Sequence, residues 1–477
     1  MNNLSSQQRK LVYLGGIVLL LIPTILLGRP SSGKKDANGQ AEDPGGILAQ
    51  QRAEYELGES TLGNVDPSSA AMNLVLLGMR GIAVNQLWMQ HDEMKKVKAW
   101  GEMRALANSI ITLQPHFLDV WRYHGWDLAY NVSSQWDAVE DRYFWVKEGT
   151  KFTKDGQQRN QKFPELAWDV GRLIGHKIGR SDEWRFFRQF FLSDPDPKFE
   201  GGVDPEMNDR GRDNYLASRD WFLEANRIDS LPGIRQRLMA PMLFRHYPSR
   251  SYFDYADARQ REGKFTDKTA TAWSLAYQDW IERFGREEFE TSAGKMYLES
   301  TSDEMRALAK QEGIPPEEKV SRWRFYQNLT NYRYWRERAK LESDPEMNDA
   351  HQEMYEGRLA FKRGELVYGP DGTPPESVQK LESGMKKFSN MLKKASEEQA
   401  DYEDKELREA NKYDLAEDRN LVEEGMLALI YWRRALEQNN RDIPKEYPLK
   451  WLWDREQDSM GEYLQEFERD LRTVQQD

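Results

Sequence analysis

Residues 88–125 read WMQHDEMKKVKAWGEMRALANSIITLQPHFLDVWRYHG, and the fold assignment depends on this stretch. Trp88 and Trp121 lie 33 residues apart, and Pro115 precedes the second Trp by six residues. Apolar side chains on both sides of Pro115 recur at spacings of three and four, which is the periodicity of helices with one buried face. The stretch therefore predicts consecutive helical hairpins that repeat with nearly constant spacing.

A period near 34 residues, with Trp-x3-Gly in a first helix and Pro at the joint, is typical of tetratricopeptide repeats. Trp121 and Gly125 have this spacing, and we expect Gly125 to lie where two helices cross closely. The first hairpin should pair a helix ending near Val97 with one at 99–113, and the second should pair 117–130 with 135–150. No stretch alternates with period two for long enough to predict a strand. We therefore predict an all-α body, built as a tetratricopeptide-like α-α superhelix.

The composition fits helices that are apolar on one face and charged on the other. Aromatic residues make up 12% of the 477 residues, including 16 Trp, while charged residues reach 31%. The formal net charge of −12 argues against a nucleic-acid partner, which would need a clustered basic surface. The absence of Cys excludes disulfides, thiolate zinc sites and thiol nucleophiles.

A membrane anchor is expected at the N-terminus. Residues 11–28, LVYLGGIVLLLIPTILLG, carry no charge. At 1.5 Å per residue they span about 27 Å, close to the hydrocarbon thickness of a bilayer. The run is longer than the apolar core of a signal peptide and no A-x-A site follows it closely, which favours an uncleaved anchor over a cleaved signal. A single N-terminal anchor usually acts as an export signal, so we expect the body outside the cytoplasm.

The chain is expected to divide into five segments. They are a transmembrane anchor at 1–28, a flexible tether at 29–46, tetratricopeptide-like repeats at 47–230, a middle helical region at 231–340 and a C-terminal helical region at 341–477. Within them, residues 151–162 are expected to form a polar loop, and 231–251 an irregular connection. The hexapeptide DPEMND, at 204–209 and again at 344–349, is expected to begin a helix each time, with Asp as N-cap and Pro in the first turn.

The repeat register predicts a binding strip. If Leu87, Trp121 and Ala167 are equivalent core positions, the next residue of each first helix, and those four and eight further on, share one helix face. The predicted strip consists of Trp88, Asp92, Lys96, Arg122, Trp126, Tyr130, Trp168, Arg172 and His176. It is aromatic and mainly basic, which suits an extended peptide with acidic groups. The competing interpretation is that its Trp side chains are packed between helices.

A catalytic or metal site finds little support in the residues. There is no dinucleotide or phosphate-binding loop and no nucleophile elbow, and none of the six His lies in an H-E-x-x-H motif. Adjacent repeats could bring His91 and His124 together, and two His with a carboxylate could bind iron. His residues in helical repeats more often serve packing, so we expect no metal, no cofactor and no enzymatic activity.

Three runs resemble an uncharacterised family of membrane-anchored helical proteins from planctomycete bacteria, some of which carry the label "iron-responsive element" protein. The runs are LGMRGIAVNQLW at 77–88, ITLQPHFLDVWRYHGWDLAYNVS at 111–133 and LIGHKIGRSDEWRFFRQFF at 173–191. The resemblance implies an anchored helical protein and supplies no reaction.

Two function classes follow from the sequence. The first is a membrane-tethered scaffold that holds a partner protein or peptide in a concave groove. The alternative is an envelope metal-dependent sensor or enzyme, whose iron site is assembled from distant residues.

Overall fold

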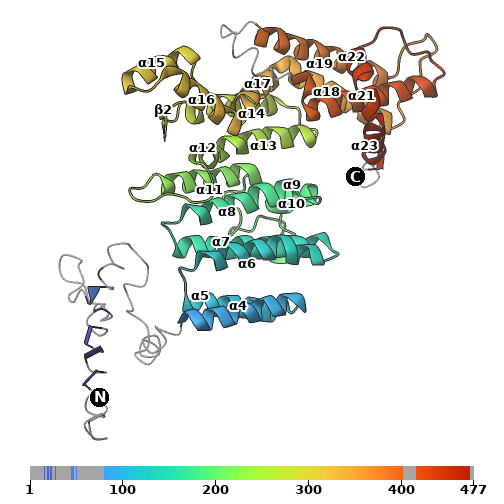
Figure 1. Cartoon of the computed structure of the whole chain (residues 1–477). Helices are drawn as coiled ribbons and strands as arrows, with labels where there is room; N and C mark the ends of the chain where they lie inside the picture. Colours follow the sequence, from blue (N-terminus) through green and yellow to red (C-terminus); the bar gives the residue numbers. More distant parts are fainter. Residues whose placement is uncertain are drawn as a thin grey trace. The chain divides into compact units, whose positions relative to one another are not determined.

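The computed structural model describes residues 80–400 and 415–472, together with isolated positions between 15 and 50. The described residues are mostly helical, with one short pair of strands, which confirms the all-α class (Figure 1). The expected anchor and tether, and the start of the first long helix, lie outside the described residues apart from those isolated positions. No helix in the described part of the chain is both long and apolar enough to cross a membrane.

The chain forms two compact units. Unit 1 comprises Met1–Leu173 and Ile228–Ile234, and unit 2 comprises Ile174–Arg227 and Arg235–Asp477. The finer divisions expected after residues 230 and 340 stay predictions.

Unit 1 consists of antiparallel helical hairpins. α4 packs on α5, and α6 packs on α7 (Figure 1). The described elements are α4 (Arg80–Lys96), α5 (Trp100–Leu113), α6 (Leu118–Asp127), the π-helical turn η1 (Leu128–Val132), the 3-10 turn η2 (Ser133–Gln135), α7 (Val139–Arg159) and α8 (Pro164–Arg172). The helices expected at 99–113 and 117–130 are therefore confirmed to within a few residues.

Gly125 lies at the close crossing of α6 and α7. A Cβ placed on Gly125 would come within 2.1 Å of Thr153 Oγ1 and 3.0 Å of the Gly149 carbonyl oxygen. A Cβ on Gly149 would in turn meet the Gly125 oxygen at 2.4 Å. Both positions therefore require glycine for the two backbones to approach this closely.

The prediction of a polar loop at 151–162 is wrong. α7 continues without a break to Arg159, and the chain turns at Asn160 before α8. Thr153 and Gly156 are buried, and a Cβ on Gly156 would meet the Trp121 ring at 2.8 Å. The segment stays helical because its small residues pack against α6, although its Lys, Asp and Gln residues suggest a solvated loop.

Unit 2 contains the remaining helices and the strands. Leu173, the first residue of η3, and Ile228 and Asp229, the last two of α11, belong to unit 1. The elements are η3 (Leu173–Lys177), α9 (Ile178–Arg180), α10 (Trp184–Leu192), η4 (Pro197–Phe199), α11 (Asn214–Asp229), α12 (Pro241–Arg245), α13 (Tyr247–Arg261), α14 (Asp267–Gln278), η5 (Asp279–Phe284), β1 (Phe289–Thr291), β2 (Gly294–Met296), α15 (Ser302–Glu312), α16 (Pro316–Leu329), α17 (Tyr332–Glu342), α18 (Pro345–Lys362), α19 (Glu376–Ala400), η6 (Leu415–Glu417), α21 (Arg419–Gln438), α22 (Lys450–Arg455), η7 (Gln457–Ser459) and α23 (Met460–Arg472).

Two expectations for unit 2 are wrong in detail. Residues 231–251 are not wholly irregular, because α12 and the start of α13 lie within them. β1 and β2 form an antiparallel hairpin in which Phe289 pairs with Met296. Each strand has three residues, too short for an alternating pattern to be recognised. A residue far away in the sequence stabilises the hairpin, since the buried Lys319 ammonium donates a hydrogen bond to the Ala293 carbonyl at 3.0 Å.

The two copies of DPEMND differ in structure. Asp344 is the N-cap of α18, its side chain accepts from the Glu346 N–H at 3.0 Å, and Pro345 begins the helix as expected. Asp204 makes the same contact with the Glu206 N–H at 3.0 Å, but the chain turns and the next helix begins only at Asn214. The prediction of a helix at the first copy is therefore wrong. The same local turn forms there, but it is followed by Gly211 rather than by apolar helical residues.

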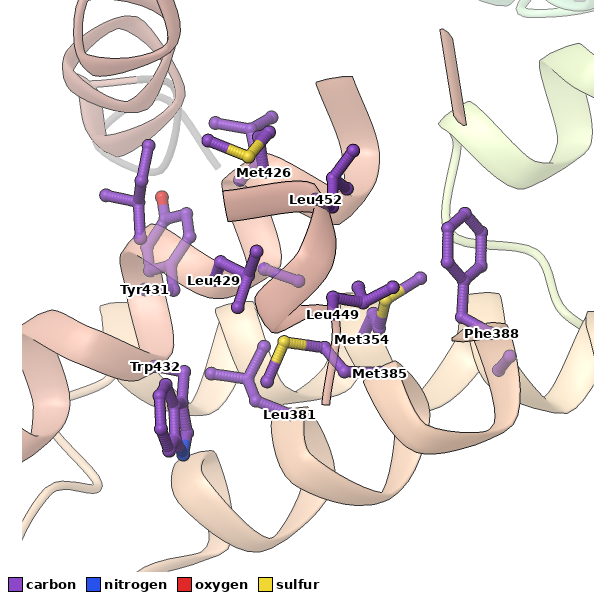
Figure 2. Packing of buried hydrophobic residues seen from close by; sticks show 14 of the residues in the cluster. Met354, Leu381, Met385, Phe388, Met426, Leu429, Tyr431, Trp432, Leu449 and Leu452 are labelled. Atoms are coloured by element: carbon purple, nitrogen blue, oxygen red, sulfur yellow. The ribbon is translucent and has the colours of Figure 1, made fainter. Parts of the chain in front are cut away.

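The largest core of unit 2 lies where α18, α19, α21 and α22 meet. Figure 2 shows Met354, Leu381, Met385 and Phe388 on two of these helices facing Met426 and other residues of the C-terminal helices. These side chains are almost fully buried. A second apolar cluster surrounds Trp280 and Trp323.

Candidate functional site

The three positions taken as equivalent for the predicted strip pack in the core of unit 1 or at its edge. Trp121 and Ala167 are fully buried, and Leu87 packs partly buried against the same cluster as Trp121. The residues that follow them, Trp88 and Arg122, are half-buried. The register taken from the Trp spacing therefore places these side chains at the edge of the core.

Aromatic rings in unit 1 form a continuous series of contacts. Trp88 meets Tyr123 with ring centroids 5.5 Å apart, and Tyr123 meets Trp126 at 6.3 Å. Trp126 stacks on Tyr130 at 5.6 Å. The Arg172 guanidinium lies 5.9 Å from the centroid of Tyr130 and 5.5 Å from that of Trp168. We call Trp88, Tyr123, Trp126, Tyr130, Trp168, Arg122 and Arg172 the aromatic strip.

Members of the aromatic strip differ in exposure. Tyr123 is 36% exposed, and Trp88, Trp126 and Tyr130 are half-buried. Trp168 is only 8% exposed, so for this side chain the packing interpretation fits better. The strip is therefore partly exposed along its length, apart from the buried Trp168.

Asp169 fixes both arginines of the strip. Arg122 Nε donates to Asp169 Oδ2 at 2.5 Å, and Arg172 Nη2 lies 3.7 Å from Asp169 Oδ1. The Asp169 side chain is 5% exposed, and burial raises the pKa of its carboxyl although both arginines act in the opposite direction. Each arginine thus shares the same buried carboxylate, which reduces the positive charge that the sequence suggested.

Lys95 and Asp127 form a second polar group beside the rings. Lys95 Nζ donates to Asp127 Oδ1 at 2.5 Å and to the Tyr123 hydroxyl at 3.1 Å. The Asn131 amide also donates to Asp127 Oδ1, at 2.6 Å. Burial acts to lower the pKa of Lys95, but the hydrogen bonds to Asp127 and Tyr123 raise it. Lys95 therefore stays protonated and is not suited to act as a base.

His91 and His124 meet beneath the aromatic strip. His91 Nε2 and His124 Nδ1 are 2.9 Å apart, and both residues are fully buried. Trp88 stacks on the His91 ring at 5.0 Å. Burial lowers the pKa of His91, and it lowers that of His124 to about 3, so both are neutral near pH 7. The expected approach of these two residues across adjacent repeats is confirmed.

The His pair has no third ligand in the described part of the chain. Among residues 80–400 and 415–472, no three His, Asp or Glu side chains are grouped so that they could hold a metal ion. His91 Nδ1 and His124 Nε2 have no hydrogen-bond partner among these residues. The geometry is that of a neutral pair joined by one shared hydrogen bond.

The remaining residues of the predicted strip lie apart from the ring series. Asp92 and Lys96 are exposed on α4 and approach each other to 4.0 Å. His176 is exposed and belongs to unit 2.

Sequence reasoning missed Tyr123, Asp127 and Asp169. Each lies three residues before a predicted strip residue, namely Trp126, Tyr130 and Arg172. The prediction followed only the spacing of four along each helix. Since residues three apart are also neighbours on a helix surface, the spacing of three was the signal that could have found them.

A buried ionic cluster in unit 2 also escaped the sequence analysis. His351 of α18 lies between two carboxylates, with Nε2 at 3.0 Å from Glu342 and Nδ1 at 2.8 Å from Glu424. Arg338 bridges Glu342 at 2.8 Å and Asp418 at 2.7 Å. Asp418 also caps α21 by accepting from two backbone N–H groups.

The charges of this cluster stabilise each other. Burial alone would lower the pKa of His351, but Glu424 and Glu342 raise it to about 10. Burial would raise the pKa of Glu342, but His351 and Arg338 lower it to about 2. Glu342 is fully buried and His351 nearly so, and the ion pairs of the cluster join α17, α18 and α21.

Comparisons of the chain with protein-family models, curated proteins and solved structures give no match.

Proposed function

We propose that the chain is a membrane-tethered helical-repeat scaffold that holds an extended segment of a partner protein along the aromatic strip. The observation that carries the proposal is the unbroken series of ring contacts from Trp88 to Tyr130, spread over α4, α6 and η1 at partial exposure. Trp and Tyr dominate the energetics of protein interfaces because they combine large apolar faces with a polar edge. A surface of this kind is suited to binding.

The repeats in this proposal are tetratricopeptide-like. The buried Trp121 and the close Gly125–Gly149 crossing support that type, as does the contact between His91 and His124 at a spacing of 33 residues. Antiparallel hairpins of this type display one helix of each pair on a common face. The strip residues come from α4, α6, η1 and α8.

Binding rather than catalysis fits the titratable groups around the strip. His91 and His124 are fully buried, and Lys95 is ion-paired to Asp127. Asp169 is buried and engaged by Arg122. A general base or nucleophile must reach the reacting atom, and none of these groups is both accessible and unpaired.

Photo-crosslinking tests the binding site in the full chain. We expect Trp126→p-benzoylphenylalanine to capture a protein in native membranes on illumination. The matched control is Phe144→p-benzoylphenylalanine, since Phe144 is 45% exposed on α7 of the same unit and outside the strip. Identical products from both positions, or none from position 126, would contradict the proposal.

Membrane tethering through residues 11–28 is tested separately. We expect the full chain to stay with carbonate-washed membranes and a chain lacking residues 1–28 to be released, because the apolar segment supplies the membrane contact. A truncated chain that still sediments with washed membranes would contradict this part of the proposal.

A further inference from the structure

Apart from the two tyrosine hydroxyls, which can both donate and accept, the polar groups of the aromatic strip are hydrogen-bond donors. The indole N–H groups of Trp88 and Trp126 have no acceptor among the described residues. Arg122 uses Nε for Asp169, which leaves its terminal nitrogens without an acceptor in the same part of the chain. The Arg172 guanidinium lies against two rings, and its Nη2 is 3.7 Å from Asp169 Oδ1. Guanidinium and indole groups cannot accept hydrogen bonds.

The two carboxylates beside the strip are buried within the protein. The side chains of Asp127 and Asp169 are 0% and 5% exposed. Lys95 and Asn131 donate to Asp127, and Arg122 donates to Asp169. Their carboxylates are therefore not available to a donor on a partner. The complementary ligand offers acceptors and flat apolar faces, and has few donors of its own.

We propose that the segment held by the aromatic strip is proline-rich and lies in the polyproline II conformation. This inference rests on the proposed function. Proline has no backbone N–H, so such a segment presents carbonyl acceptors without competing donors. Its rings pack on aromatic side chains, and the conformation is formed before binding, which lowers the entropy lost on association.

An acidic segment would also present acceptors, but the charges around the strip disfavour it. Arg122 is under the influence of three carboxylates, those of Asp169, Glu165 and Asp119. These offset the positive charge of Arg122 and Arg172, so an incoming carboxylate meets little net attraction. A neutral acceptor such as a backbone carbonyl makes its hydrogen bonds without that repulsion.

The test measures fluorescence anisotropy of a labelled oligoproline peptide on the full chain. Gly-Ser and Glu-rich peptides of the same length serve as comparisons, and we expect both to bind at least about tenfold more weakly. Trp126→Ala should weaken oligoproline binding by about tenfold or more, as for a central aromatic contact. Phe144→Ala, outside the strip, should leave binding unchanged.

A second variant keeps the test decisive if Trp126→Ala does not fold. Trp126→Phe retains a ring but removes the N–H donor, and we expect a smaller but measurable loss of oligoproline affinity. Tighter binding of the Glu-rich peptide, or of an oligosaccharide, would overturn the inference. If position 126 crosslinks a partner while oligoproline does not bind, the inference fails and the proposed function stands. If neither occurs, both fail.

Discussion

The buried histidines of the two units reach opposite charge states. His91 and His124 in unit 1 share a hydrogen bond of 2.9 Å, and burial keeps them neutral. His351 in unit 2 is just as buried, yet Glu342 and Glu424 contact its two ring nitrogens and keep it charged. The pKa of His124 is about 3 and that of His351 about 10.

The comparison shows that burial does not by itself decide whether a histidine is charged. Asp127 also acts to raise the pKa of His91, but its carboxylate is bonded to Lys95 and Asn131. A carboxylate that accepts no hydrogen bond from the ring offsets only part of the cost of burying a charge. Direct contact with a carboxylate oxygen distinguishes the unit 2 site.

Removing Glu342 should have the largest effect. Glu342→Gln leaves Arg338 and His351 buried with one carboxylate fewer, and breaking a buried pair typically costs about 3–5 kcal/mol. The two units need not unfold together, so hydrogen exchange of α17 and α18 amides measures the loss at this site. We expect faster exchange there and unchanged exchange in α6.

An ion pair between α18 and α19 that is more exposed provides the control. Glu356 pairs with Lys380 at 2.7 Å, and both side chains are 35% exposed. Glu356→Gln should change the stability of α18 by about 1 kcal/mol or less. Equal effects from the two substitutions would show that the buried cluster contributes no more than an exposed pair.

The two sites should respond to pH with opposite signs. His124 has a folded pKa of about 3 against an ordinary 6.5, so the unfolded state binds the proton more readily and stability falls as pH drops from 6.5 toward 3. His351 has a folded pKa of about 10, so its contribution is complete below 6.5 and is lost as pH rises toward 10. Each site changes the free energy of unfolding by at most about 1.4 kcal/mol per pH unit.

Titration of individual histidines tests these opposite charge states. NMR of the full chain with labelled His ring carbons, assigned by single His→Gln variants, should show His351 charged and His91 and His124 neutral at pH 7. The comparison is best made above pH 4.5, because Glu342 has an ordinary pKa of 4.5 and its own contribution is lost as pH falls toward 2. A neutral His351 at pH 7 would remove the contrast.

The unit 1 site could be anticipated because its signals are local and repeated. The spacing of 33 residues that relates Trp88 to Trp121 also relates His91 to His124, and stacking of adjacent repeats then brings the histidines together. The same reasoning failed at residues 151–162, where composition suggested a loop. Packing of Gly156 on Trp121 decides that segment, and such a contact between helices is invisible to local composition.

The unit 2 site could not be anticipated in this way. Glu424 lies 73 residues from His351, and Asp418 lies 80 residues from Arg338. No repeat relates these residues, and each taken alone reads as an ordinary surface charge on an amphipathic helix. The two DPEMND copies show the same limit, because identical sequences begin a helix at Asp344 and a turn at Asp204.

Among the substitutions in the buried cluster, we expect the smallest effect from Glu424→Gln. This variant tests how many carboxylates a buried histidine needs to stay charged. The Glu424 side chain is 24% exposed, whereas that of Glu342 is fully buried. Glu424→Gln keeps an oxygen that can accept from His351 Nδ1 but removes the charge, so we expect a smaller loss of stability than for Glu342→Gln. The pKa of His351 should fall from about 10 yet stay above 6.5, because Glu342 still contacts Nε2. The NMR titration of His351 in this variant measures the shift. A pKa below 6.5 would mean that one directly bonded carboxylate is not enough to keep a fully buried histidine charged. The difference between His351 and the His91–His124 pair would then depend on the number of carboxylates rather than on direct contact with one.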